Sequence, residues 1–182
     1  GGGFPHDIQA ADVNQDGFID LVTVCNTANK VALHFGDGAG NFTGAKSFPT
    51  EAKPRSVVVA DLNKDNIPDL VVGTDSRTVN YLLGTGGGNF APYVYLISGV
   101  ANWGIGVGDF DKNGALDICA ADYMEDKLSI HLNTGKVKAG KMEFLPVQQI
   151  QSGDYNFDLV VGDFALDGDL DIVFGNWNAQ CR

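Results

Sequence analysis

A ten-residue pattern rich in aspartate occurs four times along the 182-residue chain. The copies read DVNQDGFIDL, DLNKDNIPDL, DFDKNGALDI and DFALDGDLDI, and they occupy residues 12–21, 61–70, 109–118 and 163–172. Successive copies begin 49, 48 and 54 residues apart. Self-similarity at a period of about fifty residues is typical of folds that repeat one supersecondary unit and bury its apolar face against the neighbouring units. The chain is therefore predicted to be a repeat protein.

Short apolar runs surround each copy of the pattern. In the second unit, one run precedes the copy at residues 56–60 and another follows it at residues 70–72. Both are too short for helices and rich in β-branched residues, so they are predicted to be buried strands. A third strand is expected at residues 79–83, and a fourth from Asn89, after the glycine-rich turn at residues 84–88. Four antiparallel strands in a unit of this length are typical of a β-propeller blade.

We predict an all-β fold, a β-propeller of four-stranded antiparallel blades that forms a single domain over residues 1–182. Its repeats are approximately 1–48, 49–97, 98–151 and 152–182, the last of them incomplete. This division gives about fourteen strands, or about three and a half blades. An open half-propeller would leave two sheet edges able to pair with other chains. Further blades in a longer chain, or self-association, are therefore expected.

Oxygen-bearing side chains fall at positions 1, 3, 5 and 9 of the first three copies, counted from the first aspartate, and at positions 1, 5 and 9 of the fourth. In every copy, position 7 can add a backbone carbonyl. An all-oxygen, carboxylate-rich cage suits a hard cation, and a flexible loop favours Ca²⁺ over Mg²⁺. The candidate ligands are Asp12, Asn14, Asp16, Phe18 and Asp20; Asp61, Asn63, Asp65, Ile67 and Asp69; Asp109, Asp111, Asn113, Ala115 and Asp117; and Asp163, Asp167, Asp169 and Asp171. Up to four Ca²⁺ are expected, one per loop. Position 3 of the fourth copy is Ala165, so that site is expected to be weaker or to recruit a water.

The charge of these loops explains why a cation is expected. The chain has 23 acidic residues and a net charge of −11, and four Ca²⁺ would reduce that charge to −3. Two carboxylates about 5 Å apart, at an effective dielectric of about 20, repel each other by about 3 kcal/mol. The alternative is a set of solvated aspartate-rich turns, against which the repetition in register argues. An EF-hand is excluded, because it needs a glutamate at position 12 and flanking helices.

The four loops, their period and the segment FGDGAGNF at residues 35–42 resemble FG-GAP/VCBS repeats. This family builds the seven-bladed propeller of integrin α-subunit heads and of several lectin-like proteins. The resemblance covers essentially the whole chain. It implies a seven-bladed propeller with a Ca²⁺ in each hairpin between the first and second strands of a blade, and a ligand on the opposite face.

The residue six positions before each loop differs from unit to unit. These residues are His6, Arg55, Trp103 and Phe157. Structural positions tend to repeat, whereas positions that diverge between units are freer to specialise. Trp and Tyr can stack on sugars or anchor a protein interface. The candidate ligand-binding residues are His6, Arg55, Trp103, Tyr123 and Trp177, the last two from turns between second and third strands. The alternative is that these aromatic residues only fill gaps between blades.

No catalytic residues are predicted. His34 and His131 occupy equivalent places on predicted third strands, which favours a structural role, and no Ser/His/Asp or Cys/His constellation can be assembled from the motifs. The acidic net charge disfavours nucleic acid and anionic membrane surfaces as partners. No apolar run approaches the length of a membrane span, so membrane insertion is not expected.

We therefore expect a non-enzymatic Ca²⁺-binding module, secreted or on the cell surface, that presents a site for a carbohydrate or protein ligand. Millimolar Ca²⁺ outside cells would keep low-affinity sites filled. Two alternatives stay open, namely a scaffold or accessory domain of a polysaccharide-degrading enzyme and a purely structural spacer in a surface protein. Glycosidase chemistry would need two acids at a suitable separation on the ligand face, which sequence spacing does not establish.

Overall fold

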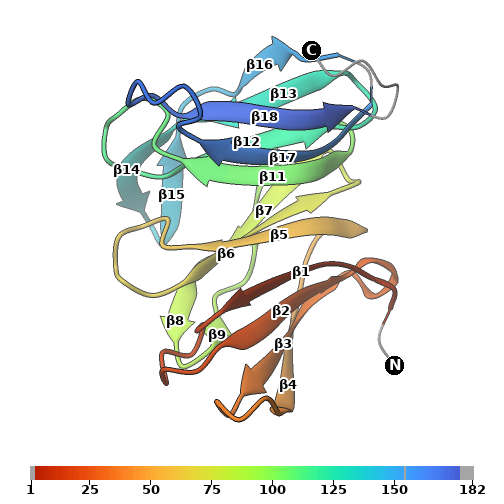
Figure 1. Ribbon diagram of the computed structural model, residues 1–182, viewed down its shortest axis with the longest axis vertical. Coiled ribbons are helices and arrows are strands. Elements are labelled where there is room, and N and C mark those ends of the chain that lie inside the picture. Colours follow the sequence, from red (N-terminus) through yellow and green to blue (C-terminus); the bar gives the residue numbers. More distant parts are fainter. Residues whose placement is uncertain (1–2, 154, 177–182) are drawn as a thin grey trace.

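The computed structural model describes residues 3–153 and 155–176, and its main sheets follow one another along the long axis of the molecule (Figure 1). Sheet 1 contains β1 (Pro5–Ala11), β2 (Asp20–Cys25), β3 (Lys30–Gly36) and β4 (Phe42–Pro49). Sheet 2 contains β5 (Pro54–Ala60), β6 (Asp69–Thr74), β7 (Thr78–Leu82) and β10 (Val94–Ile97). Sheet 3 contains β11 (Asn102–Gly108), β12 (Asp117–Asp122), β13 (Lys127–His131) and β16 (Gln148–Gln151). Sheet 4 contains β17 (Asn156–Gly162) and β18 (Asp171–Asn176).

The chain is all-β, and within each sheet every neighbouring pair of strands is antiparallel. Its one described helix is a short 3-10 turn, η1 (Asn26–Ala28), between β2 and β3. Within the described ranges, no helix has the length and apolar character that crossing a membrane would require.

Two additional hairpins extend the repeat units beyond the predicted strands. β8 (Gly84–Gly86) pairs with β9 (Asn89–Phe90), and β14 (Asn133–Lys138) pairs with β15 (Lys141–Phe144). The prediction that the fourth strand of the second unit starts at Asn89 is therefore wrong, because that strand is β10. Pro92 separates β9 from β10, and Pro146 separates β15 from β16. Proline has no N–H to donate to a sheet, so it divides what would otherwise be one long strand.

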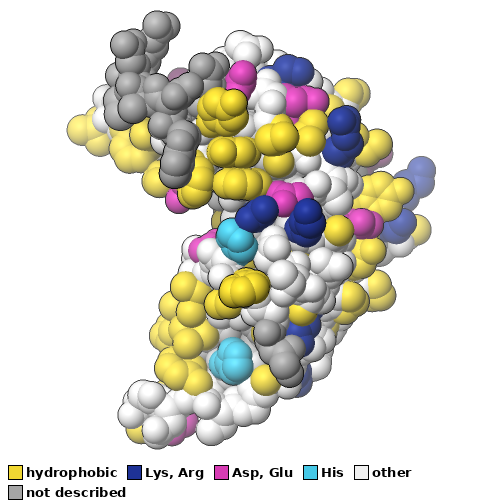
Figure 2. Space-filling model, turned by 90° about the vertical axis from the view of Figure 1, so that its right-hand side faces the viewer, with side chains coloured by type: hydrophobic (Ala, Val, Ile, Leu, Met, Phe, Trp, Pro, Cys, Tyr) yellow, Lys and Arg dark blue, Asp and Glu magenta, His cyan; other side chains and the backbone are white. Residues whose placement is uncertain are grey.

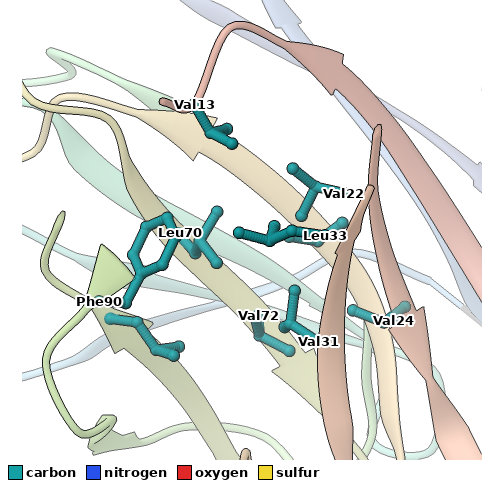
Figure 3. Close-up of a cluster of buried hydrophobic side chains, with 10 residues drawn as sticks. Val13, Val22, Val24, Val31, Leu33, Leu70, Val72 and Phe90 are labelled. Carbon is teal, nitrogen blue, oxygen red and sulfur yellow. The ribbon is translucent and has the colours of Figure 1, made fainter. Parts of the chain in front are cut away.

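Apolar side chains fill the space between successive sheets. The first cluster joins Val22 and Leu33 of sheet 1 to Leu70 of sheet 2 (Figure 3). The second includes Ile118 of β12 together with residues of sheet 2, and the third includes the adjacent Cys119 together with residues of sheet 4. Successive residues of a strand point to opposite faces of its sheet, so β12 serves two cores at once. Every residue of β6 and β12 is buried as a result.

The first strand of every sheet carries a register irregularity at the same place. The pairing with the second strand skips one residue in each case, namely His6, Arg55, Trp103 and Phe157. A β-bulge leaves one residue out of the ladder and re-aims its side chain. The first strands also lie next to one another, with β1 beside β5, β5 beside β11 and β11 beside β17. The repeated bulge therefore directs side chains from four units toward one region.

Candidate functional sites

The acidic loops join the first and second strands of each sheet and lie on the left side of Figure 1. They are called loop 1 to loop 4 and comprise residues 12–20, 61–69, 109–117 and 163–171. The bulged residues lie near the other ends of the same first strands. The predicted metal ligands and three of the predicted ligand-binding residues, His6, Arg55 and Trp103, thus occupy opposite ends of these strands.

The first aspartate of each loop holds the backbone in a tight curl. In loop 3, Asp109 Oδ1 accepts a hydrogen bond from the Asn113 N–H at 3.0 Å, and Oδ2 accepts one from the Gly114 N–H at 2.8 Å. The equivalent contacts are made by Asp12, Asp61 and Asp163. Position 6 has a positive φ in all four loops. Glycine or asparagine at that position accepts this conformation at low cost.

The aspartate at position 9 ties its loop to the region where the third strand ends. Asp117 is fully buried; its Oδ2 accepts from the Phe110 N–H at 2.8 Å and its Oδ1 from the Asn133 N–H at 2.7 Å. Asp20 and Asp69 are equally buried and make the same pair of contacts. Sequence reasoning assigned this position to metal binding alone, whereas the geometry shows that it also anchors the loop.

Loop 3 brings three carboxylates together. One oxygen from each of Asp109, Asp111 and Asp117 lies within 4.8 Å of the other two. Hard carboxylate oxygens in such a cluster are the donors that Ca²⁺ prefers. The residues present therefore fit the divalent cation that the sequence predicts.

The other loops differ from loop 3 in how position 3 is used. In loops 1 and 2, the amide of Asn14 donates to Asp16 Oδ2 at 2.8 Å, and that of Asn63 donates to Asp65 Oδ2 at 2.9 Å. Loop 4 has Ala165 there and so offers no side-chain oxygen. At position 7, the N–H of Phe18, Ile67, Ala115 or Asp169 donates to the position-5 side chain.

Burial perturbs the acids at position 9. Burial raises the pKa of Asp69 to about 6, and the nearby carboxylates of Asp65 and Asp61 add to the effect. The pKa of Asp117 is raised for the same reasons, burial first and then the charges of Asp111 and Asp109. A cation bound among these groups would favour their ionised forms.

At the opposite end of the first strands, the bulged residues line a pocket of about 150 Å³. Its wall consists of His6, Asp7, Arg55, Ser56, Trp103, Phe157 and Asp158. On the face that Figure 2 shows, hydrophobic side chains gather above a histidine that lies close to basic and acidic side chains. The structure thus brings together three of the predicted ligand-binding residues and the fourth bulged residue.

Asp75, which is not itself part of the wall, hydrogen-bonds to two of the wall residues. Its carboxylate accepts from Arg55 Nη2 at 2.7 Å and from Arg55 Nε at 3.0 Å, and it also accepts from Trp103 Nε1 at 2.7 Å. Arg55 Nη1 lies 2.7 Å from His6 Nε2. Burial lowers the pKa of His6, and the charge of Arg55 lowers it further. The imidazole is therefore neutral near pH 7.

Trp103 is held on both faces of its ring. The Arg55 guanidinium lies 4.4 Å from the ring centroid, and Tyr123 stacks on the ring at 3.9 Å with an interplanar angle of 4°. These two groups are too large to share one face, so the indole is sandwiched between them. Stacking of a sugar on Trp103 therefore does not fit this geometry. Phe157 and Tyr155 offer the exposed aromatic surface instead, with 45% and 42% of their areas accessible.

Sequence reasoning missed the residues that follow three of the four bulges. Asp7, Ser56 and Asp158 line the pocket as much as the bulged residues do. They occupy one repeat position, which is Asp in the first and fourth units, Ser in the second and Gly in the third. Ser56 Oγ is buried and has no hydrogen-bond partner among the described residues. The predicted Trp177 lies outside the described residues.

Comparison with solved structures shows a shared fold at low sequence identity. BBS1N in its complex with ARL6DN is 16% identical, with a TM-score of 0.59 over 97% of this chain and 47% of that one. The K499G mutant of NanB sialidase from Streptococcus pneumoniae is 11% identical, with a TM-score of 0.59 over 95% of this chain and 28% of that one. The chain thus spans less than half the length of either structure. No curated protein sequence matches it.

The sequence profile described as "FG-GAP-like repeat" matches three overlapping segments, residues 12–72, 61–120 and 109–174. Each match begins at the first aspartate of one acidic loop and extends past the next loop. The repeat that the profile describes is thus the unit of loop and sheet seen in the structure. Since the matches together cover most of the sequence, the chain belongs to the FG-GAP-like repeat family.

Proposed function

We propose that this chain is a calcium-binding recognition module of the β-propeller type. The Ca²⁺ ions bind in the acidic loops and stabilise the sheets, and a ligand binds at the pocket on the opposite face. The repeats support a propeller-type arrangement, and the contact of each first strand with the next is the arrangement expected around a propeller axis. A secreted or cell-surface location follows from this proposal, because extracellular Ca²⁺ is abundant enough for modular sites of low affinity.

The observation that carries calcium binding is the convergence of Asp109, Asp111 and Asp117 in loop 3. Asp109 and Asp117 are already fixed by backbone N–H groups, whereas Asp111 is exposed and accepts one hydrogen bond, from the Asn113 N–H. Asp109, Asp117 and the exposed Asp111 would hold a cation together, each with a carboxylate oxygen. Loops 1 and 2 would bind in the same way, with the carbonyl oxygen of asparagine at position 3.

The substitution Asp111→Ala tests calcium binding and gives loop 3 the residue that loop 4 has at position 3. We expect saturating Ca²⁺ to raise the melting temperature of the wild-type chain by several degrees, since a ligand that binds only the folded state stabilises it. The variant should show a smaller rise and bind about one Ca²⁺ fewer at low concentration. In EDTA the free energies of unfolding of the two proteins should agree within about 0.5 kcal/mol, because the Asp111 side chain is exposed. Identical melting of the wild-type chain in Ca²⁺ and in EDTA would refute calcium binding.

The proposal of ligand recognition is supported chiefly by the pocket, to which each unit contributes one bulged residue. It combines a guanidinium, carboxylates and exposed aromatic surface, and the units contribute different side chains to it. A repeat protein that needed only to fill its centre would use the same apolar residue each time. A carbohydrate or a protein side chain can meet such a mixture with hydrogen bonds and stacking.

Glycan and peptide arrays would test recognition, with Phe157→Ser as the pocket variant. Val160→Ser is the matched control, because Val160 lies on the same strand, is 58% exposed and is not part of the pocket wall. We expect any ligand retained by the wild-type chain to be retained by Val160→Ser and lost by Phe157→Ser. Equal retention by both variants would place the binding site elsewhere.

The alternative is that the chain supports a polysaccharide-degrading enzyme. The similarity to a sialidase concerns the fold alone. Both carboxylate oxygens of Asp7 in the pocket accept backbone N–H groups, from Ile8 at 2.7 Å and from Val57 at 3.0 Å, which gives this acid a structural role between β1 and β5. Release of reducing sugar from polysaccharides in the same array set would favour the enzyme, and binding without turnover would favour recognition.

A further inference from the structure

The side chains at position 4 of loops 1 to 3 reach toward the next loop along the chain. Gln15 Nε2 donates to the Asn66 carbonyl at 2.6 Å. The Lys64 ammonium lies 3.1 Å from the place where a Cβ on Gly114 would be. The Lys112 ammonium forms an ion pair with Asp169. Three successive loops thus place the position-4 side chain next to their neighbour.

The backbone at position 4 favours this reach. Gln15, Lys64 and Lys112 have φ values of 62°, 62° and 58°. Residues other than glycine and asparagine rarely adopt this left-handed conformation, and Leu166 at position 4 of loop 4 shares it with a φ of 57°. The contact is therefore a regular feature of how adjacent loops are placed.

Loop 4 differs from the others in both its ligands and its neighbour. It lacks a side-chain oxygen at position 3, where Ala165 stands, and it alone has an acid at position 7, which is Asp169. The Lys112 ammonium pairs with the Asp169 carboxylate, and both side chains are largely exposed. An ammonium group therefore lies at the loop that has the weakest oxygen cage.

We propose that the Lys112 ammonium serves as the built-in cation of loop 4, so that loops 1 to 3 bind Ca²⁺ and loop 4 does not. This inference rests on the proposed calcium binding and assigns its stoichiometry. Lys112 brings one positive charge and three N–H donors to loop 4, where it pairs with Asp169, an acid that the other loops lack at position 7. Lys112 lies between the candidate loop 3 ligands Asp111 and Asn113. Ca²⁺ binding in loop 3 and the ion pair with loop 4 therefore involve the same segment of backbone.

Equilibrium dialysis with metal analysis would count the bound Ca²⁺ in the wild-type chain and in three variants. The wild-type chain should bind roughly three Ca²⁺. Ala165→Asp restores the missing oxygen, and the double variant Ala165→Asp/Lys112→Gln also removes the competing ammonium. We expect the double variant to bind a fourth Ca²⁺ at least about tenfold more tightly than Ala165→Asp alone, because a competing charge is absent. Ala165→Asp/Lys64→Gln is the matched control and should behave like Ala165→Asp.

The outcomes separate this inference from the proposal on which it rests. A wild-type chain that binds no Ca²⁺ refutes calcium binding itself. Four equivalent Ca²⁺ in the wild-type chain, or equal fourth-site affinity with and without Lys112, overturns the role of Lys112 while leaving calcium binding intact. Thermal melting of every variant in EDTA verifies that each one is folded.

Discussion

At the scale of single residues, the two repeat-equivalent histidines, His34 and His131, differ in how deeply they are buried. His131 on β13 is 3% exposed, and its Nε2 is buried with no hydrogen-bond partner among the described residues. His34 on β3 is only partly buried. Burial lowers the pKa of His131 to about 4. The prediction of a structural role agrees with this setting, in which the imidazole is neutral and packs near Phe144.

His131 should make the chain less stable in mild acid. Its ordinary pKa is near 6.5, so the unfolded chain binds a proton below that pH while the folded chain does not until about pH 4. Stability from this group is thus complete above pH 6.5 and is lost as pH falls toward 4, by up to about 3 kcal/mol. Urea unfolding in EDTA from pH 7 to pH 5 would measure the loss. His131→Gln should reduce it, and His34→Gln, at the repeat-equivalent but less buried position, is the matched control.

Buried aspartates of the acidic loops change stability with pH in the opposite direction to His131. The compared proteins must therefore have the same acidic loops. Because burial raises the pKa of Asp69 to about 6, this carboxyl stabilises the folded chain as pH falls from about 6 to about 4. The wild-type chain and both histidine variants share this contribution, so the difference between them isolates the histidine. If His131→Gln kept the full loss of stability in acid, the assigned role of His131 would be wrong.

At the scale of elements, the sequence predicted what repeats and missed what varies between units. The acidic loop and the strands around it recur at fixed spacing, so four copies of the signal reinforce one another. The hairpins β8–β9 and β14–β15 recur only in part, and prolines divide them from the fourth strands. The bulges could not be predicted, because register depends on pairing across the sheet. They are nevertheless what turns the predicted residues into a pocket.

Phe42 and Phe90 each follow an asparagine, but they should contribute differently to the free energy of unfolding. Phe90 of β9 is 9% exposed and meets Phe48 of sheet 1 edge to face at 5.2 Å, whereas Phe42 of β4 is 44% exposed. Phe90→Ala should cost about 3–5 kcal/mol of unfolding free energy, because it leaves a cavity between sheets 1 and 2. Phe42→Ala should cost about 1 kcal/mol or less. Urea unfolding in saturating Ca²⁺ measures both, and equal costs would contradict the assigned contact between sheets.

At the scale of the whole molecule, burial is highest in the middle sheets and lower in sheet 4. β12 hydrogen-bonds to β11 on one side and to β13 on the other, while β18 pairs with β17 alone among the described strands. Val160 of β17 and Val173 of β18 are each more than half exposed. The core clusters link each sheet to the next, so the sheets support one another in series.

This arrangement predicts an ordered gradient of hydrogen exchange. Amides of β6 and β12 should exchange slowest, at rates near those of global unfolding, because their strands are buried and paired on both sides. Amides of β18 should exchange at least about tenfold faster, through local opening that leaves the middle sheets intact. Exchange followed by mass spectrometry in dilute protein would measure both, with EDTA and Ca²⁺ compared. If loops 1 to 3 bind Ca²⁺ and loop 4 does not, Ca²⁺ should slow β6 and β12 more than β18. Equal slowing of all three strands would count against that assignment, and equal protection in EDTA would contradict the series arrangement of the sheets.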